Sequence, residues 1–392
     1  MRVLTRLLIR TSLGAVALST AAAAVAAVPT SAFASTGRSS VTGHVYVNDN
    51  TTGTNTIGAF DRHADGSLSP EAGSPFPAGG AGTGAGLASQ GAVQLTGDGH
   101  FVVAVDAGSD QISVLRITHD GSLRLVPHGV VSSGGDLPVS IAIHGQRVYV
   151  ANAGTSDTNY TGFQLGSDGQ LRPLTGSTVE LPTGSQPGDV LFNGTGTKLV
   201  GTRVGTSEID SSTVGDNGRL TASPGSPFSA QGLGPFGSEF RPTNPNQLFV
   251  SNAHNGGSGT GTVSVFDDSI DGTLTPVAGS PFADLQTAPC WVEISHDGRF
   301  LFAVNTGSGE ISSYSIDPAG GLTLLGSTPV ASTGGVGAVD ARLSPDGRTL
   351  YIDESSVGAI GAFAVDGGTL TALQGSPASL PAGATPAGIA VS

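Results

Sequence analysis

Three side chains in the central part of the sequence could together support hydrolysis at a carbonyl carbon. Asp189 or His254 could act as the general base that activates water, and Arg203 could stabilise the oxyanion that develops. A serine nucleophile is not favoured, because no Gly-x-Ser-x-Gly motif stands at an expected strand-to-helix turn. Arg203, Asp189 and His254 are therefore candidate catalytic residues that would act through water.

A second set of residues could bind a ligand beside them, namely Phe236, Trp291, Asn152, Asn252 and Asn305. The asparagines belong to a series of polar residues that end one expected strand in each repeat: Asp49, Asp106, Asn152, Arg203, Asn252, Asn305 and Glu354. If these strands end on the face where the preceding strands begin, the series forms a ring near Asp189, Phe236 and His254. The alternative is that these residues only cap strands and start turns, as Asn and Asp often do.

The elements that position these residues follow from an internal repeat of about fifty residues. Seven copies of a Gly-polar-Leu turn, the sixth shortened to Gly-Leu, place leucines at Leu68, Leu123, Leu171, Leu220, Leu274, Leu322 and Leu370. In the sixth repeat, alternating apolar residues predict strands over 288–295, 300–305 and 310–316, with a fourth starting at Leu322. Four antiparallel strands per repeat indicate an all-β, seven-bladed β-propeller.

The two ends of the repeat region predict a closed ring. The first repeat begins at residues 44–47 with what matches a second strand, and the missing first strand is found at residues 385–392. We expect this C-terminal strand to complete blade one. Closure covers blade faces and strand edges that a lone sheet would leave exposed.

The N-terminus has the pattern of a secretory signal peptide. Arg2, Arg6 and Arg10 precede an Ala-rich apolar stretch, and the residues up to Ala34 offer a small-x-small cleavage site. The expected organisation is a signal peptide over 1–34, a polar linker over 35–42 and the propeller over 43–392. An uncleaved membrane anchor is the alternative, although the apolar stretch is short for spanning.

The charge balance restricts the partners that we expect. Removing the three arginines of the leader changes the formal net charge from −14 to about −17, which disfavours nucleic acid and anionic membranes. The expected product is a secreted, extracellular monomer. Its expected partner is a small-molecule lactone or carbohydrate-derived ligand, or an extracellular protein.

Metal and cofactor sites are not predicted. The eight His residues form no HExxH pair, and a calcium loop around Asp267, Asp268 and Asp271 fits only loosely. The single Cys290 permits no internal disulfide and reads as a buried, inert thiol.

Charged residues also fall inside the first strands. Glu239, Glu293 and Arg342 occupy equivalent positions there, and Asp340 and Trp291 share their parity. They predict an inter-blade Glu–Arg bridge. The alternative is a carboxylate-lined cation site of the kind that calcium occupies.

Residues 289–302 and the Gly-Ser-Pro-Phe connectors at Gly73, Gly225 and Gly279 resemble the bacterial lactonase family of seven-bladed β-propellers. That family includes 6-phosphogluconolactonase-like and carboxymuconate-cyclase-like proteins. The resemblance spans residues 43–392 and implies hydrolysis or isomerisation of a sugar-derived or carboxylated lactone without nicotinamide or flavin.

Two features favour a non-catalytic alternative. Residues 148–152 resemble the Tyr-Val-Thr-Asn repeat of surface propellers, which are mostly binding or structural modules. The first strands also open without the His or Arg that is common in lactonase-type propellers, and Trp291 stands where the similar motif has His. An enzyme and an extracellular binding module therefore both remain open.

Overall fold

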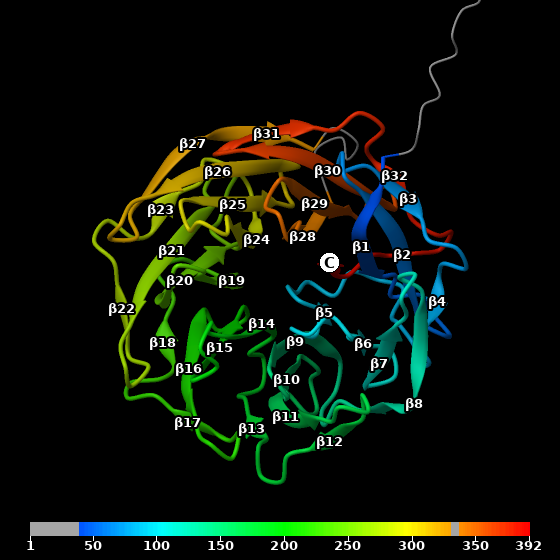
Figure 1. Ribbon diagram of the computed structural model, residues 1–392. Coiled ribbons are helices and arrows are strands. Elements are labelled where there is room, and N and C mark those ends of the chain that lie inside the picture. The colour runs from blue at the N-terminus through cyan, green and yellow to red at the C-terminus, as the bar shows by residue number, and fades with distance from the viewer. Residues whose placement is uncertain (1–38, 331–336) are drawn as a thin grey trace, which may run out of the picture. The chain divides into compact units, whose positions relative to one another are not determined.

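The computed structural model describes residues 39–330 and 337–392. Ser39–Ser392 form one compact unit, and the predicted signal peptide lies outside the described residues. This unit is all-β, as predicted, with its sheets arranged around a central axis (Figure 1). Within the same residues, no helix has the length and hydropathy needed to cross a membrane.

Seven antiparallel sheets form the blades, each running from an inner strand at the axis to an outer strand at the rim. The inner strands are, from blade one to blade seven, β33 (Ile389–Val391), β5 (Val93–Leu95), β9 (Pro138–His144), β14 (Pro187–Phe192), β19 (Pro235–Arg241), β24 (Pro289–Ile294) and β28 (Ala338–Leu343). The second strands are β1 (Val41–Asn48), β6 (Phe101–Asp106), β10 (Arg147–Asn152), β15 (Lys198–Arg203), β20 (Asn244–Asn252), β25 (Phe300–Asn305) and β29 (Thr349–Glu354).

The third and outer strands complete the blades. The third strands are β2 (Thr56–His63), β7 (Gln111–Ile117), β11 (Asn159–Leu165), β16 (Glu208–Val214), β21 (Thr262–Asp268), β26 (Glu310–Ile316) and β30 (Ala359–Asp366). The outer strands are β3 (Leu68–Pro70), β8 (Leu123–Ser132), β12 (Leu171–Pro173), β17 (Leu220–Ala222), β22 (Leu274–Pro276), β27 (Leu322–Pro329) and β31 (Thr369–Ala372).

The ring closes as the sequence predicts. β33 pairs antiparallel with β1, with Tyr46 opposite Ala390. The inner strand β33 also contacts both β28 and β5, so the C-terminal segment joins blade seven to blade two through blade one. The C-terminus accordingly lies at the centre of the disk (Figure 1).

The outer edge of most blades is more divided than the four strands per repeat that the sequence predicts. In five blades a second short segment pairs with the same third strand: β4 (Phe76–Pro77), β13 (Val179–Glu180), β18 (Phe228–Ser229), β23 (Phe282–Ala283) and β32 (Ala378–Ser379). In blade one, the Ser74 hydroxyl accepts a hydrogen bond from the Ala59 N–H at 2.8 Å. In a continuous outer strand, a backbone carbonyl would accept this bond. Ser280 makes the same contact to Val265. The Gly-Ser-Pro connector therefore interrupts the outer strand, and its serine hydroxyl replaces the missing backbone acceptor.

The glycine of the recurring Gly-polar-Leu turn accepts a hydrogen bond from the preceding blade. Tyr46 donates from its hydroxyl to the Gly121 carbonyl of the next blade at 2.9 Å, and Tyr149 donates to Gly218 at 2.8 Å. Both glycines have positive φ, which glycine adopts without steric cost. The repeat thus fixes neighbouring blades to one another.

Candidate active site

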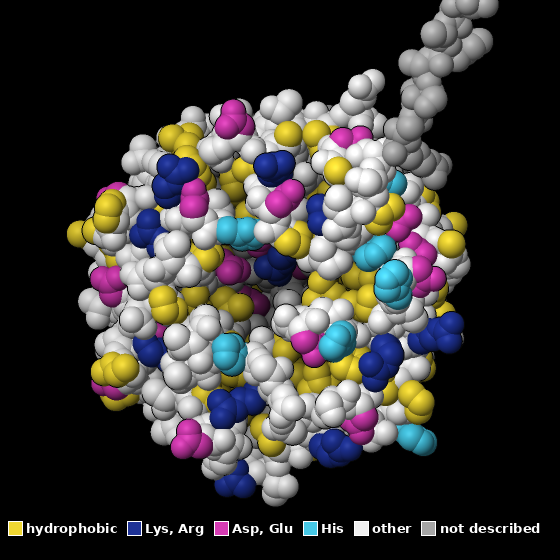
Figure 2. Space-filling model, viewed as in Figure 1, with side chains coloured by type: hydrophobic (Ala, Val, Ile, Leu, Met, Phe, Trp, Pro, Cys, Tyr) yellow, Lys and Arg dark blue, Asp and Glu magenta, His cyan; other side chains and the backbone are white. Residues whose placement is uncertain are grey.

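A cavity of about 390 Å³ lies at the end of the axis where inner strands begin, between blades five, six and seven on one side and residues 86–89 and 385–387, which precede β5 and β33, on the other. The first residues of β19, β24 and β28 line it together with residues just past the ends of β20, β25 and β29. This arrangement confirms that first strands begin and second strands end on one face. The molecule is hollowed at its centre, with charged side chains of both signs inside (Figure 2).

An aromatic pair forms one wall of the cavity. The rings of Phe236 and Trp291 lie 5.3 Å apart in an edge-to-face arrangement. The Trp291 indole N–H donates to the Ser89 carbonyl at 2.7 Å, which fixes the ring against the loop before β5. Both predicted ligand-binding aromatics therefore line the cavity, and their packing leaves a rigid apolar surface.

Two titratable side chains with acid–base capacity reach this cavity, Asp340 and His254. Asp340 is 1% exposed, and its carboxylate accepts N–H bonds from Gly91, Ala341 and Ile389 at 2.9–3.4 Å. Burial raises the pKa of Asp340 to about 6, while the Arg342 charge opposes that shift. His254 also lines the cavity, and its side chain is exposed to solvent. A buried carboxylate and an accessible imidazole thus share one apolar pocket.

The structure does not bring Arg203 and Asp189 into the cavity with His254. Arg203 is committed within its own blade: its Nε donates to Asp210 at 2.6 Å and its Nη1 lies 3.2 Å from Glu208. Asp189 accepts from the Ser238 hydroxyl at 2.6 Å and the Ser140 hydroxyl at 3.2 Å. Burial raises the pKa of Asp189 to about 7, although the Ser238 hydrogen bonds lower it. The three predicted catalytic residues therefore do not converge on this pocket.

The predicted ring of strand-end residues exists, but its three asparagines hydrogen-bond to the third strands of their own blades. Asn152 donates to Asn159 at 2.8 Å, Asn305 donates to Ser312 at 2.9 Å, and Asn252 donates to Ser264 at 2.8 Å. All three asparagines are fully buried, and none is among the cavity-lining residues. These contacts agree with the alternative that the residues cap strands.

The channel charges form the predicted inter-blade bridge. Arg342 Nη1 lies 3.0 Å from Glu293 Oε2 and 3.9 Å from Glu239 Oε2. Although burial opposes it, the carboxylates of Glu293, Asp340 and Glu239 raise the pKa of Arg342. Burial and the Glu293 charge together raise the pKa of Glu239. The Arg342 charge of this bridge also acts on Asp340, which lines the cavity.

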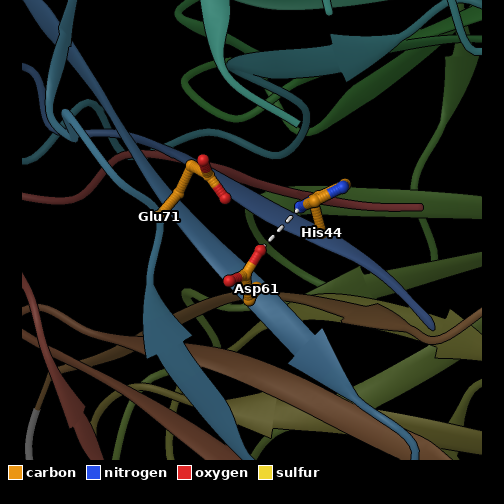
Figure 3. A group of neighbouring side chains, drawn as sticks. All are labelled: His44, Asp61 and Glu71. Atoms are coloured by element: carbon orange, nitrogen blue, oxygen red, sulfur yellow. Dashed lines mark ion pairs between the residues drawn. The ribbon is translucent and has the colours of Figure 1, made fainter. Parts of the chain in front are cut away.

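The remaining predicted features have structural partners. Lys198 Nζ lies 3.1 Å from Asp268, so a lysine occupies the loosely predicted calcium loop, and Asp271 accepts from the Thr273 N–H. Burial raises the pKa of the Cys290 thiol to about 11, which keeps it protonated. Sequence reasoning did not anticipate that His44, Asp61 and Glu71 come together (Figure 3).

Comparisons with known proteins agree with this fold. Residues 54–192 match the family model described as Lactonase, 7-bladed beta-propeller. A Bacteroides uniformis protein provisionally assigned as a 6-phosphogluconolactonase is 20% identical, with a TM-score of 0.71 over 89% of this chain and 99% of that chain. The periplasmic gluconolactonase of Pseudomonas aeruginosa is 18% identical, with a TM-score of 0.69 over 89% and 98%. No curated protein sequence matches the chain.

Proposed function

We propose that this seven-bladed propeller, which resembles the lactonase family, acts on a lactone bound in the central cavity. The observation that carries the proposal is that buried Asp340 and accessible His254 line the same cavity as the Phe236–Trp291 wall. An apolar wall suits the carbon skeleton of a small ring, and the two titratable groups suit its ester bond.

The proposed reaction is addition of water to the lactone carbonyl. Asp340 takes a proton as the water oxygen bonds to the carbonyl carbon, and His254 donates a hydrogen bond to the oxyanion that forms. Collapse of this intermediate breaks the ring C–O bond. The proton held by Asp340 then passes to the leaving oxygen, so the product is an open hydroxy acid and the enzyme returns to its starting state.

The lining favours a neutral lactone over a phosphorylated one. No Lys or Arg is among the described residues that line the cavity. A phosphate or a second carboxylate would enter without a cation to pair it, which is costly in a mostly apolar pocket. We therefore propose a neutral, sugar-derived lactone as the substrate class.

The test is a hydrolysis assay with neutral, phosphorylated and carboxylated lactones at constant pH. We expect turnover of a neutral lactone, and a loss of about 100-fold or more in kcat for Asp340→Asn. The matched control is His100→Ala, an exposed histidine far from the cavity lining. Full activity in both Asp340→Asn and His254→Gln would contradict the assignment.

One observation favours a binding module as the second candidate. Several polar groups at the cavity already donate to backbone carbonyls: Thr306 to Ala338 at 2.9 Å, Ser355 to Gly337 at 2.9 Å, and Trp291 to Ser89. Such a site binds an apolar face with few free donors. Saturable lactone binding by calorimetry without any turnover would favour this candidate.

We further propose that the protein is exported and that its leader is removed. The basic, then apolar, then small-residue pattern before Ala34 supports this. N-terminal sequencing of protein from the culture medium should begin at Ser35. Retention of residue 1 in a membrane fraction would support an anchor instead.

A further inference from the structure

A group of potential metal ligands lies at the outer part of blade one, away from the cavity. His44 comes from β1, Asp61 from β2, and Glu71 directly follows β3. One ligand atom from each lies within 4.8 Å of the other two. Figure 3 shows His44 and Asp61 joined as a pair, with the Glu71 carboxylate turned toward the same space.

The carboxylates and the imidazole of this group have few partners outside the group. Glu71 is 7% exposed, and its carboxylate lies against that of Asp61. His44 Nδ1 is buried without a hydrogen-bond partner, 3.4 Å from Asp61 Oδ1. Among the residues described, no Lys or Arg forms an ion pair with either carboxylate; nearby Arg62 donates to the Ser392 and Thr42 carbonyls. The buried Glu71 carboxyl and the half-buried Asp61 carboxylate therefore lie together without an ion-paired Lys or Arg among the described residues, and a bound metal ion would neutralise both.

The internal repeat shows that Glu71 departs from the pattern of the other blades. Its backbone N–H donates to Ala59 of the third strand at 2.9 Å. The residues that make the same backbone contact in blades three, four, five and seven are Leu174, Ser223, Val277 and Leu373. None of them is charged. A carboxylate thus stands where the repeat otherwise places an apolar or small side chain.

Packing alone accounts for His44 but not for its neighbours. The equivalent residue of blade two, Phe101, packs against Gly169 of the next blade, and His44 packs in the same way against Gly121. Across β1 and β2, His44 faces Asp61, whereas Phe101 faces Arg116. Blade one therefore combines two differences from blade two, at His44 and Asp61, with the unusual Glu71.

We propose that His44, Asp61 and Glu71 bind a divalent transition-metal cation of the zinc class. Two ligands about 2.1 Å from a tetrahedral metal lie about 3.4 Å apart, which matches the separation of His44 Nδ1 and Asp61 Oδ1. One imidazole nitrogen with two carboxylate oxygens suits zinc and its neighbours, whereas calcium prefers six to eight oxygens. Water would complete the coordination.

The proposed cation would tie together three segments of the blade that closes the ring. β1 is the strand that pairs with β33, and β2 carries Asp61 opposite His44. Bound metal would neutralise the two carboxylates and hold β1, β2 and the end of β3 at fixed spacing. Its effect is therefore on the stability of blade one, independent of any reaction in the central cavity.

The experiment measures zinc binding to the full chain after chelator treatment and dialysis. We expect one zinc per chain by calorimetry and elemental analysis, and a rise in Tm with added zinc. Glu71→Leu installs the residue of blades three and seven, and His44→Phe installs that of blade two. Each should weaken zinc binding by about 100-fold or more and abolish the Tm rise.

The control is His100→Ala, which removes an exposed histidine that also pairs with an aspartate, at 3.1 Å. It should bind zinc as the unaltered chain does. A cobalt(II) spectrum provides a second measurement, since its ligand-field bands should change in His44→Phe even if that variant is less stable. Zinc binding that survives both blade-one substitutions, or no binding by the unaltered chain, would overturn the proposal.

Discussion

Arg342 of blade seven and Glu293 of blade six form an ion pair of 3.0 Å that faces the central channel. Glu293 uses its other oxygen to accept the Leu343 N–H at 2.9 Å. One glutamate therefore binds both the side chain and the backbone of the neighbouring inner strand. The pair joins two blades through their inner strands, and the Arg342 charge also acts on the cavity residue Asp340.

Removing the cation should destabilise the ring. Arg342→Ala leaves Glu293, Glu239 and Asp340 without their shared positive charge, and we expect a loss of about 2 kcal/mol in unfolding free energy. Urea denaturation measures this change. The control Arg299→Ala breaks an exposed pair with Asp297 and should cost less than about 0.5 kcal/mol. Equal effects of the two substitutions would show that the channel ion pair contributes no more to the free energy of unfolding than an exposed ion pair does.

Lactone hydrolysis should depend on pH through Asp340. Its pKa is raised to about 6, and only the deprotonated carboxylate can accept a proton from water. We expect kcat/KM to fall tenfold per pH unit well below 6 and to level off above about 7. Steady-state rates between pH 4.5 and 8 measure this profile. A flat profile across that range would exclude Asp340 as the base.

Stability should also depend on pH through Glu354. Its Oε2 is buried without a hydrogen-bond partner, and burial raises its pKa to about 7. Because the folded-state pKa exceeds the unfolded one, this group favours folding most below about pH 4.5, and that contribution is lost as pH rises toward 7. Glu354→Gln, which stays neutral, should therefore gain about 2 kcal/mol at pH 8 and little at pH 4.

Chemical denaturation at the two pH values tests this expectation. Glu180→Gln serves as the control, because Glu180 is an exposed glutamate on an outer strand segment. It should leave the pH dependence unchanged. If Glu354→Gln were destabilised equally at pH 4 and pH 8, the ionised carboxylate would not be the source of the cost.

The closing strand should be as sensitive as an ordinary core strand. Ile389 on β33 is fully buried, and Ile389→Ala should cost about 2–4 kcal/mol through lost burial and the cavity that remains. Ile270→Ala, at a position 94% exposed, should change stability little. Thermal and urea unfolding compare them. A small effect at Ile389 would mean that β33 frays from β1 without loosening the ring.

The regular parts of the blades were predictable because they depend on local patterns. The strands expected over 300–305 and 310–316 coincide with β25 and β26. Alternating apolar residues and glycine turns set these boundaries. The split outer strands were not predicted. The Ser74 hydroxyl replaces a backbone acceptor there, and the alternation of apolar and polar residues does not indicate such a replacement.

The candidate site was predictable only as a face of the disk. Several inner strands shift register where they start, between Pro187 and Asp189, between Pro289 and Trp291, and between Ala338 and Ala341. A bulge breaks the strict alternation of side chains, so parity cannot tell which residues face the pocket. Asp189 consequently bonds to serines of neighbouring blades, whereas Asp340 reaches the cavity.

The sequence by itself determined seven blades, their strand order and the closure by the C-terminal strand, because repeat spacing and side-chain alternation are properties of the chain. Only the tertiary structure decided that Arg203 is held by Asp210 and Glu208, that Asp340 shares a pocket with His254, and that Glu71 meets His44 and Asp61. These outcomes depend on strand register and on contacts between segments far apart along the chain. Such contacts arise from packing, which a one-dimensional pattern does not specify.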